Sequence, residues 1–377
     1  MYLEEHVIFR AEFKKFLDQE IAPHLAGWER DGIVSRDAWR KMGASGFLCP
    51  WLPEEHGGSG ADFLYSVIIT EELSRAGAVG LMAPLHSDII APYLHHLGTE
   101  EQKSRWLPKC ATGEIILAVA MSEPDTGSDL SRIATRAERD GDCYLVNGTK
   151  TFISNGVNAD LVIVACRTDR SVKASQGISL LCVERGSPGF QRGRKLEKMG
   201  MHAQDTAELI FEDCRIPLGN RLGEENRGFY YLMEHLQQER LVCAIMAQAM
   251  AEAMLEMTIR YTRERKAFGK PVCSFQHNAF KIVEMATEIE MGRAFLDRLI
   301  KRHMRGDSVV TEVSMAKAWI PEMANRVAYQ CQQLHGGYGY MEEYPICRFY
   351  RDVRPISIFG GTTEIMKLIV AKNLELL

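Results

Sequence analysis

The stretch from residue 232 to residue 250 reads LMEHLQQERLVCAIMAQAM, and it holds the pattern that decides the fold. Apolar residues recur at the three- and four-residue steps of an α-helix, which predicts a long helix from about 227 to 264. The apolar stripe consists of Leu232, Leu236, Cys243, Met246 and Met250. Glu239 fills the step between Leu236 and Cys243, so the pattern predicts a carboxylate on the buried face of this helix.

A carboxylate in a protein interior must be paired with a cation, protonated or functional. Burial raises its pKa, and a base with a pKa near neutrality is suited to removing a weakly acidic proton. Periodicity alone favours a structural ion pair for Glu239, with an arginine on a neighbouring helix as its partner. A catalytic base is the alternative, and the helical pattern leaves both open.

The helix around Glu239 is the first of four in the last third of the chain. Further helical segments are predicted from about 275 to 304, from about 309 to 335 and from 363 onward, with short connections. Long helices in a row with short loops are typical of a helix bundle.

The beginning of the chain is also predicted to be helical. The sequence Thr99-Glu100-Glu101-Gln102 has the capping-box pattern that opens a helix. The segment 81–97 is apolar and contains two prolines, which predicts a kinked or two-part helical wall. A first helix near the N-terminus is expected to bury one stripe, made of Val7, Ile8, Phe13, Phe16, Leu17 and Ile21.

Short β-rich runs replace the helical pattern after residue 116. They include ILAVAMS, ADLVIVACRT, GISLLCVE and AELIFEDCRI, with Asp-Gly and Asn-Gly pairs between runs as turns. We therefore predict a mainly α protein with a middle β domain. The predicted domains are a helical domain at 1–116, a β domain at 117–224 and a four-helix bundle at 225–377.

Composition and charge exclude several functions. A net charge of −5 gives no support for nucleic-acid binding. No uncharged apolar run approaches the ~18 residues of a membrane helix. The ten cysteines form no CxxC pair, so we expect neither zinc nor an iron–sulfur cluster, no other metal site, and free thiols in a reducing compartment. The N-terminus shows no secretion signal, so we expect the cytoplasm of a bacterium, with a processed mitochondrial form as the alternative.

Several glycine-rich segments could hold a ligand. They are SEPDTGSDL at 122–130, LHGGYGYMEEYP at 334–345 and the IFGGTTE that precedes the last helix. Glycine permits close backbone approach, and free N–H groups at turns and helix starts bind anions. None is a phosphate-binding GxxxxGK[ST] loop or a GxGxxG turn. Taken singly, each is more simply an ordinary loop or a helix cap.

Taken together, six segments resemble one family. In chain order they match the acyl-CoA dehydrogenase family over residues 1–377, most closely its long-chain type and next its isovaleryl type. The matching segments are AVAMSEPDTGSDL, NGTKTFISNG, MGMHAQDTAELIFEDCRIP, RERKAFGKPVCSFQ, QQLHGGYGYMEEYPICRFYRD and IFGGTTEIMKLIVAK. The resemblance implies an N-terminal helical domain, a β-barrel-like middle domain, a C-terminal four-helix bundle and FAD as the cofactor.

The resemblance also implies where FAD binds. Residues expected to contact FAD within one chain are Met121, Ser122, Ser128, Phe152, Ser154, Thr362 and Glu364. Residues expected to reach the FAD of a neighbouring subunit are Arg265, Phe268, Gln276, Gln333 and Gly337. A site shared in this way implies at least a dimer, and the family is usually a homotetramer.

The catalytic residues follow from one departure from the commonest family pattern. Many relatives carry the catalytic glutamate in the last loop, at the position of Gly360 here. The long-chain and isovaleryl types take it from the first bundle helix, where Glu239 matches. The implied reaction is α,β-dehydrogenation of an acyl-CoA thioester to trans-2-enoyl-CoA, as in fatty-acid β-oxidation. The N–H of Gly360 is expected to stabilise the negative charge that develops on the thioester oxygen.

Substrate and partners are expectations of the same kind. Arg240 is expected to shape the surroundings of the base, Ser128 to lie near the pantetheine or pyrophosphate, and Tyr231, Leu232 and Leu236 to line the acyl tunnel with segment 81–97. We expect medium or long straight chains, with short branched chains as the alternative, and an electron-transfer flavoprotein as acceptor. An oxygen-using flavoprotein of the same fold and a non-catalytic acyl-CoA binder are the competing hypotheses.

Overall fold

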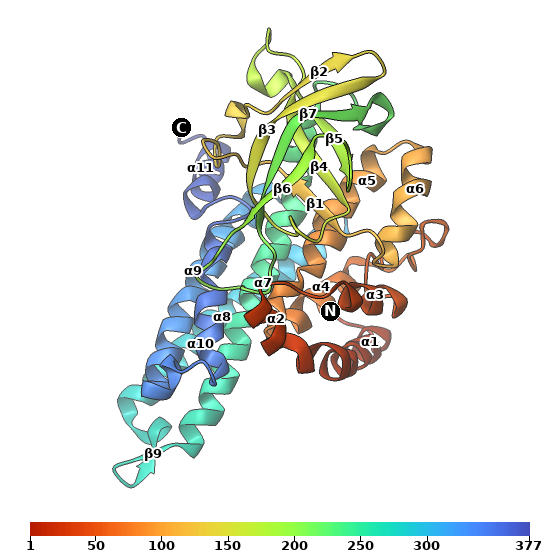
Figure 1. The fold of residues 1–377 in the computed structure, drawn as a ribbon. Coiled ribbons are helices and arrows are strands. Elements are labelled where there is room, and N and C mark those ends of the chain that lie inside the picture. The colour runs from red at the N-terminus through yellow and green to blue at the C-terminus, as the bar shows by residue number, and fades with distance from the viewer.

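A computed structural model describes residues 1–377, apart from the side chain of Ala174. Figure 1 shows helices in red and orange at the start of the chain, a twisted sheet in yellow and green, and long helices in teal and blue that extend away from the sheet. The prediction of a mainly helical protein with a β domain in the middle is confirmed.

The first helices of the chain pack around a core of their own, which includes Phe13 and Trp39, whereas Leu94 and Trp106 belong to the main core. Thr99 and Gln102 cap α6 reciprocally, which confirms the capping box. On α1 the predicted stripe is only partly right, because Val7 and Ile8 are 60% and 59% exposed while His6 takes the buried position. The helices are α1 (Glu4–Phe16), α2 (Leu25–Asp31), α3 (Arg36–Ala44), α4 (Phe63–Arg75), α5 (Ala91–Leu97) and α6 (Glu100–Ala111).

The apolar segment 81–97 forms the two-part wall that its prolines predict. A π-helical segment, Leu85–Ile90, follows Pro84 and leads directly into α5. The wide π turn is a feature often found at functional sites. This wall packs against both α7 and β1, so it lies where the helices meet the sheet.

The middle of the chain forms one mixed sheet in the order β6-β7-β3-β2-β4-β5-β8, with β1 parallel to β4. No described strand pair joins β6 to β8, so the expected β domain in the middle of the chain is an open sheet and not a closed barrel. One residue pair, Arg136 with Arg167, links β2 to β4 at the seam between the two halves. The strands are β1 (Leu117–Ala120), β2 (Arg136–Asp140), β3 (Cys143–Ile153), β4 (Leu161–Arg167), β5 (Ile178–Glu184), β6 (Phe190–Lys195), β7 (Ala207–Pro217) and β8 (Arg221–Leu222).

The long C-terminal helices surround α7, which contacts α4, α8 and α9. The predicted segments near 227–264, 275–304, 309–335 and from 363 agree closely with α7, α8, α9 and α11, whereas α10 was not predicted. A small hairpin of β9 and β10 stands at the far tip of the bundle (Figure 1). The elements are α7 (Gly228–Glu264), β9 (Lys266–Ala267), β10 (Lys270–Pro271), α8 (Gln276–Met304), α9 (Val310–His335), α10 (Pro345–Asp352) and α11 (Thr363–Asn373).

Helix α7 is long and apolar enough to cross a membrane if only length and composition are considered. The expectation concerned uncharged runs and is unaffected, because the 18-residue window that meets this test, like every window of this length in α7, includes charged residues. Within the protein, however, 78% of that window is buried against other elements. Its apolar surface is thus used as the core of the bundle.

The ten cysteines are all free thiols, as expected from their spacing. All are buried except Cys273, which is half-buried. Burial raises the pKa of Cys166 and of Cys243 to about 12, so both thiols are protonated at neutral pH.

Candidate active site

A cavity of about 400 Å³ lies where the sheet, the wall segment 81–97, α7 and the last loop meet. It brings together eight residues predicted to bind FAD or act in catalysis, from four separate parts of the chain. They are Met121, Ser122, Ser128, Phe152, Ser154, Glu239, Gly360 and Thr362. Chain segments more than 200 residues apart in sequence thus meet around one enclosed space.

Glu239 lies on the buried face of α7, as its place in the apolar stripe predicts. The residue is 9% exposed, and its Oε2 atom has no hydrogen-bond partner among the described residues. Burial raises the pKa of this carboxyl group, and the charges of Arg240 and Lys317 oppose the rise only in part. The residue has no close ion-pair partner among the described side chains, which argues against the structural interpretation.

Gly360 faces Glu239 directly. A Cβ atom at residue 360 would lie 3.6 Å from Glu239 Oε1 and 3.0 Å from Cys243 Sγ. The backbone of Gly360 has a φ of +64°, a left-handed conformation that glycine adopts without strain. The Gly360 N–H donates no hydrogen bond within the described structure, so it is free to bind a ligand atom.

Lys317 is a residue of this site that the sequence reasoning missed. It is fully buried on α9, and its Nζ atom donates a hydrogen bond to the carbonyl oxygen of Gly361. The same signal that pointed to Glu239 was available for it, because Lys317 occupies a step in an apolar stripe on its own helix. That stripe comprises Val313, Ile320, Ala324, Val327 and Cys331.

On the sheet side, Phe152 is held in an unusual conformation. Its φ is +59°, and its side chain is 69% exposed beside the cavity although large aromatic residues are normally buried. Such strain is tolerated where the surrounding structure imposes it, often at ligand sites. An exposed aromatic face is suited to packing against a flat ring.

A buried ion pair fixes the two segments that surround Phe152. Lys150 is fully buried and its Nζ lies 2.8 Å from Glu123 Oε1; the same amine donates a hydrogen bond to the carbonyl oxygen of Met121 at 3.0 Å. Burial opposes the charge of Glu123, but Lys150 and two backbone amides outweigh it and hold its pKa below the usual value. The pair therefore ties the turn after β1 to the end of β3.

Thr362 and Glu364 have different places relative to the cavity. Thr362 caps α11, since its hydroxyl accepts a hydrogen bond from the Ile365 N–H at 3.3 Å, and it lines the cavity. Glu364 is exposed on the first turn of the helix and does not line it.

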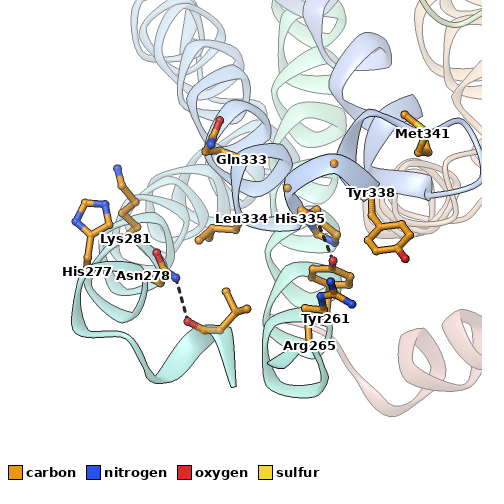
Figure 2. Close-up of a pocket in the computed structure, with 13 residues that line it drawn as sticks. Tyr261, Arg265, His277, Asn278, Lys281, Gln333, Leu334, His335, Tyr338 and Met341 are labelled. Carbon is orange, nitrogen blue, oxygen red and sulfur yellow. Dashed lines mark hydrogen bonds between the residues drawn. The ribbon is translucent and has the colours of Figure 1, made fainter. Parts of the chain in front are cut away.

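A second cavity, of about 840 Å³, lies at the other end of the bundle (Figure 2). It contains Arg265, Gln333 and Gly337, three of the residues predicted to reach a neighbouring subunit's FAD. Tyr261 stacks on His335 in its wall, with ring centroids 4.3 Å apart, and its hydroxyl donates to the His335 carbonyl oxygen.

Phe268 and Gln276 do not line this second cavity. Phe268 is 96% exposed at the tip of the hairpin between β9 and β10, with a φ of +50°. Gln276 is exposed at the start of α8. Their predicted contacts with FAD stay predictions.

Of the residues expected to line an acyl tunnel, Tyr231, Leu232 and Leu236 lie outside the cavity near Glu239, whereas segment 81–97 contributes to its lining. Leu232 and Leu236 are buried in the core, and the hydroxyl of Tyr231 accepts a hydrogen bond from the Glu224 N–H. Arg240 is buried beside the base, and it too is not part of the cavity lining. The apolar lining comes from Met82, Leu85 and Ile89 of that segment, together with Val119, Val242 and Met246. Steps of three and seven residues along α7 from Glu239 lead to Val242 and Met246, a signal that sequence reasoning did not use for the tunnel.

Three family models match this chain. They are the acyl-CoA dehydrogenase N-terminal domain at residues 3–114, the middle domain at 118–214 and the C-terminal domain at 226–375.

Whole-chain comparisons agree with the domain matches. The chain is 47% identical to the mitochondrial long-chain specific acyl-CoA dehydrogenase of Mus musculus, over 99% of this chain and 87% of that protein. It is 39% identical to the mitochondrial isovaleryl-CoA dehydrogenase of Pongo abelii, over 98% and 88%. The crystal structure of an acyl-CoA dehydrogenase from Geobacillus kaustophilus superposes with a TM-score of 0.98 at 59% identity, covering 99% of each chain.

The ion pair between Lys150 and Glu123 generates a stability prediction. Lys150→Met leaves the Glu123 carboxylate buried without its cation, so we expect the free energy of unfolding to fall by about 3–5 kcal/mol. The double variant Glu123→Gln with Lys150→Met removes both charges and should recover a large part of this loss. Thermal unfolding of both variants checks the expectation, and an equal loss in the two would contradict it.

Proposed function

The chain belongs to the acyl-CoA dehydrogenase family of FAD-dependent oxidoreductases, and we propose that it converts acyl-CoA thioesters to trans-2-enoyl-CoA with Glu239 as the base. One observation carries this assignment: a buried carboxylate without a hydrogen-bond partner for Oε2 faces Gly360 across a cavity. Gly360 stands where many relatives carry their glutamate, so the two positions approach the same point in space.

Glu239 is suited to proton abstraction because its environment makes it a stronger base. Burial raises its pKa toward the range in which a carboxylate removes a weakly acidic proton. In our proposal Glu239 takes the proton from the carbon next to the thioester carbonyl. FAD, when bound, supplies the acceptor for the hydride that leaves the neighbouring carbon.

The loop at residue 360 has the complementary task. Removing the proton places negative charge on the thioester oxygen, and a fixed N–H donor at that point is worth on the order of 10²–10³ in rate. The N–H of Gly360 is free to make this bond. A side chain at residue 360 would start 3.6 Å from Glu239 Oε1 and only 3.0 Å from Cys243 Sγ, so a larger residue would crowd the space beside the carboxylate.

The residues of the first cavity fit the flavin end of FAD. Phe152 offers an aromatic face, Ser122 and Ser154 offer hydroxyl groups, and the glycines at 360 and 361 permit close backbone approach. We propose Met121, Ser128, Thr362 and Glu364 as further FAD contacts, with Ser128 also near the pantetheine. Arg240 is proposed to shape the surroundings of the base. Tyr231, Leu232 and Leu236 stay assigned to the acyl tunnel from resemblance alone.

The distance between the two cavities along α7 supports a site shared between subunits. Glu239 and Tyr261 are 22 residues apart on one helix, which is about 33 Å at 1.5 Å per residue. One FAD molecule that reaches Glu239 therefore cannot also reach the second cavity of the same chain. We propose that Arg265, Gln333 and Gly337, together with Phe268 and Gln276, contact the FAD of a neighbouring subunit.

Exposed apolar residues support assembly, proposed here as a homotetramer. Phe280, Val283 and Met291 are 57%, 60% and 61% exposed on α8, and Phe268 stands almost free at the bundle tip. Contiguous apolar surface of this kind marks interaction sites. A second copy of the chain would cover it.

Similarity supports medium or long straight acyl chains as substrates. The chain is 47% identical to a long-chain enzyme and 39% identical to an isovaleryl enzyme, so short branched chains are the second candidate. The apolar lining ends at Met82 and Met246, flexible side chains that can adapt to a chain end. Behind them lies a small cavity of about 10 Å³ that both methionines also line.

Other parts of the proposal rest on the family. Members act on acyl-CoA substrates and pass electrons to an electron-transfer flavoprotein, which we propose as acceptor here. The bacterial relatives support a place in bacterial β-oxidation and in the cytoplasm. The domain division at 1–116, 117–224 and 225–377 is also proposed, supported by the ranges of the matching family models.

Replacing the base tests the central assignment. In Glu239→Gln we expect FAD to stay bound, while anaerobic reduction of the flavin by an acyl-CoA slows by about 10²–10⁴-fold, the range for loss of a general base. Stopped-flow absorbance of the flavin measures this rate. The control is Glu234→Gln, an exposed carboxylate on the same helix, which should behave as wild type. Normal reduction by Glu239→Gln would show that another group is the base.

Moving the carboxylate tests whether the two positions are interchangeable. Glu239→Gly should be inactive, and adding Gly360→Glu should restore part of the flavin reduction because the two sites lie within contact distance. Restoration will be incomplete, since a non-glycine residue at φ +64° is strained and meets Cys243. No gain over the single variant would contradict the proposed spatial equivalence.

The methionines at the end of the cavity generate a specificity prediction. Met246→Ala joins the main cavity to the small one behind it, so a longer acyl chain can bury more methylene groups. We expect kcat/KM for a long chain, divided by kcat/KM for a medium chain, to rise about tenfold, at ~0.8 kcal/mol per additional buried methylene. A panel of straight and branched acyl-CoAs of graded length measures it. Met250→Ala, one turn further on and outside the lining, is the matched control. A preference of the wild type for isovaleryl-CoA would support the branched-chain alternative.

A further inference from the structure

We infer that Lys317 is a positioning residue that holds the loop of Gly360 in place and keeps Glu239 in its anionic form. This inference rests on the proposed role of Glu239 as the base. It assigns a task to a buried lysine that the reaction scheme above does not use. Lys317 donates a hydrogen bond to the last loop, approaches Gly360 closely, and is one of two cations near Glu239.

The hydrogen bond joins the bundle to the last loop. Lys317 Nζ donates to the carbonyl oxygen of Gly361, the residue directly after the proposed oxyanion donor. Both Gly360 and Gly361 have left-handed φ values, +64° and +93°, so the loop has little intrinsic preference for one conformation. A fixed amine on a rigid helix therefore supplies an anchor that the glycines themselves lack.

Lys317 also lies close to the position where the two proposed catalytic groups meet. A Cβ atom at Gly360 would be 3.8 Å from Lys317 Cε, and 3.6 Å from Glu239 Oε1. The carboxylate, the loop and the lysine stem thus surround a single small volume. The side chain is fully buried, so its charge is not screened by water.

The titratable groups near Glu239 and Lys317 lie on three elements. Arg240 and Cys243 lie on α7, Lys317 and Glu322 lie on α9, and Tyr93 lies on α5. Arg240 and Lys317 are the two cations that lower the pKa of Glu239 against the effect of burial. Burial lowers the pKa of Lys317 itself, and Glu239 opposes that change.

Burying Lys317 within the apolar stripe of α9 costs free energy. Lysine is among the residues least often fully buried, and its amine must lose hydration at this position. An apolar residue would complete the stripe on α9 at no such cost. A fully buried amine beside a proposed base and its partner loop is therefore better explained by a function than by packing.

Three substitutions separate the two tasks of the lysine. Lys317→Met removes charge and donor, Lys317→Gln keeps a donor without charge, and Lys317→Arg keeps both. Lys301→Met, an exposed lysine on α8, controls for the change in net charge. The measurement is the rate of anaerobic flavin reduction by octanoyl-CoA across pH, in holoenzyme whose FAD content has been checked.

The expected result follows from the sign of the charge. A nearby cation favours the carboxylate, so its removal raises the pKa of Glu239 and moves the acid limb of the pH–rate profile to higher pH by about one unit. At pH values below the pKa of Glu239, the rate of flavin reduction then falls about tenfold for each pH unit. Lys317→Met and Lys317→Gln should both show this displacement, whereas Lys317→Arg and Lys301→Met should keep the wild-type profile. At the pH optimum, Lys317→Met should be slower than Lys317→Gln because it also loses the loop anchor.

Other outcomes have separate meanings. Suppose that wild type is active, Glu239→Gln is inactive, and Lys317→Gln keeps the wild-type acid limb. This result overturns the inference about Lys317 and leaves the proposed function intact. Wild type that no acyl-CoA reduces overturns the proposed function instead. If the neutral variants do not retain FAD, infrared titration of the Glu239 carboxyl band in Lys317→Gln and wild type, both without FAD, decides: titration at higher pH in Lys317→Gln supports the role of the charge, and equal titration in the two contradicts it.

Discussion

The constraint on which this site depends is the burial of one carboxylate without a close counter-ion. Glu239 gives up hydration on the apolar face of α7, and the described structure offers its Oε2 atom no hydrogen bond in return. Such a group is costly unless something is bound to it or it is used in chemistry. Gly360, the amine of Lys317 and the hydroxyl-bearing turn after β1 all lie near this carboxylate.

Each wall of the cavity is fixed by a different interaction. On the sheet side, the buried pair of Lys150 and Glu123 joins the turn after β1 to the end of β3, next to Phe152 with its positive φ. On the bundle side, Lys317 anchors the last loop through the carbonyl of Gly361. The third wall is the π-helical segment Leu85–Ile90, which packs against α7. Buried polar contacts therefore set the geometry, and apolar packing supplies most of the stability.

In our proposal a single chain carries two separate halves of a FAD site. The flavin end matches the cavity beside Glu239, and the residues proposed for the rest of a partner's FAD lie about 33 Å along α7. The exposed apolar face of α8 and the free aromatic ring of Phe268 lie on the same end of the molecule as this second cavity. Assembly and cofactor binding are therefore coupled in our proposal, because each subunit completes the site of another.

The sequence alone determined the helical and β segments, the buried position of Glu239 and, through matched segments, the family, because periodicity and local motifs are properties of neighbouring residues. It could not show that the sheet stays open, that Val7 and Ile8 face solvent, or that Tyr231, Leu232 and Leu236 miss the cavity. The sequence shows Lys317 as a polar residue within an apolar stripe, but it does not show that the amine contacts the last loop. Only the tertiary structure decided these points, because they depend on which helix faces lie opposite one another, and contacts between residues distant in the chain leave no local pattern.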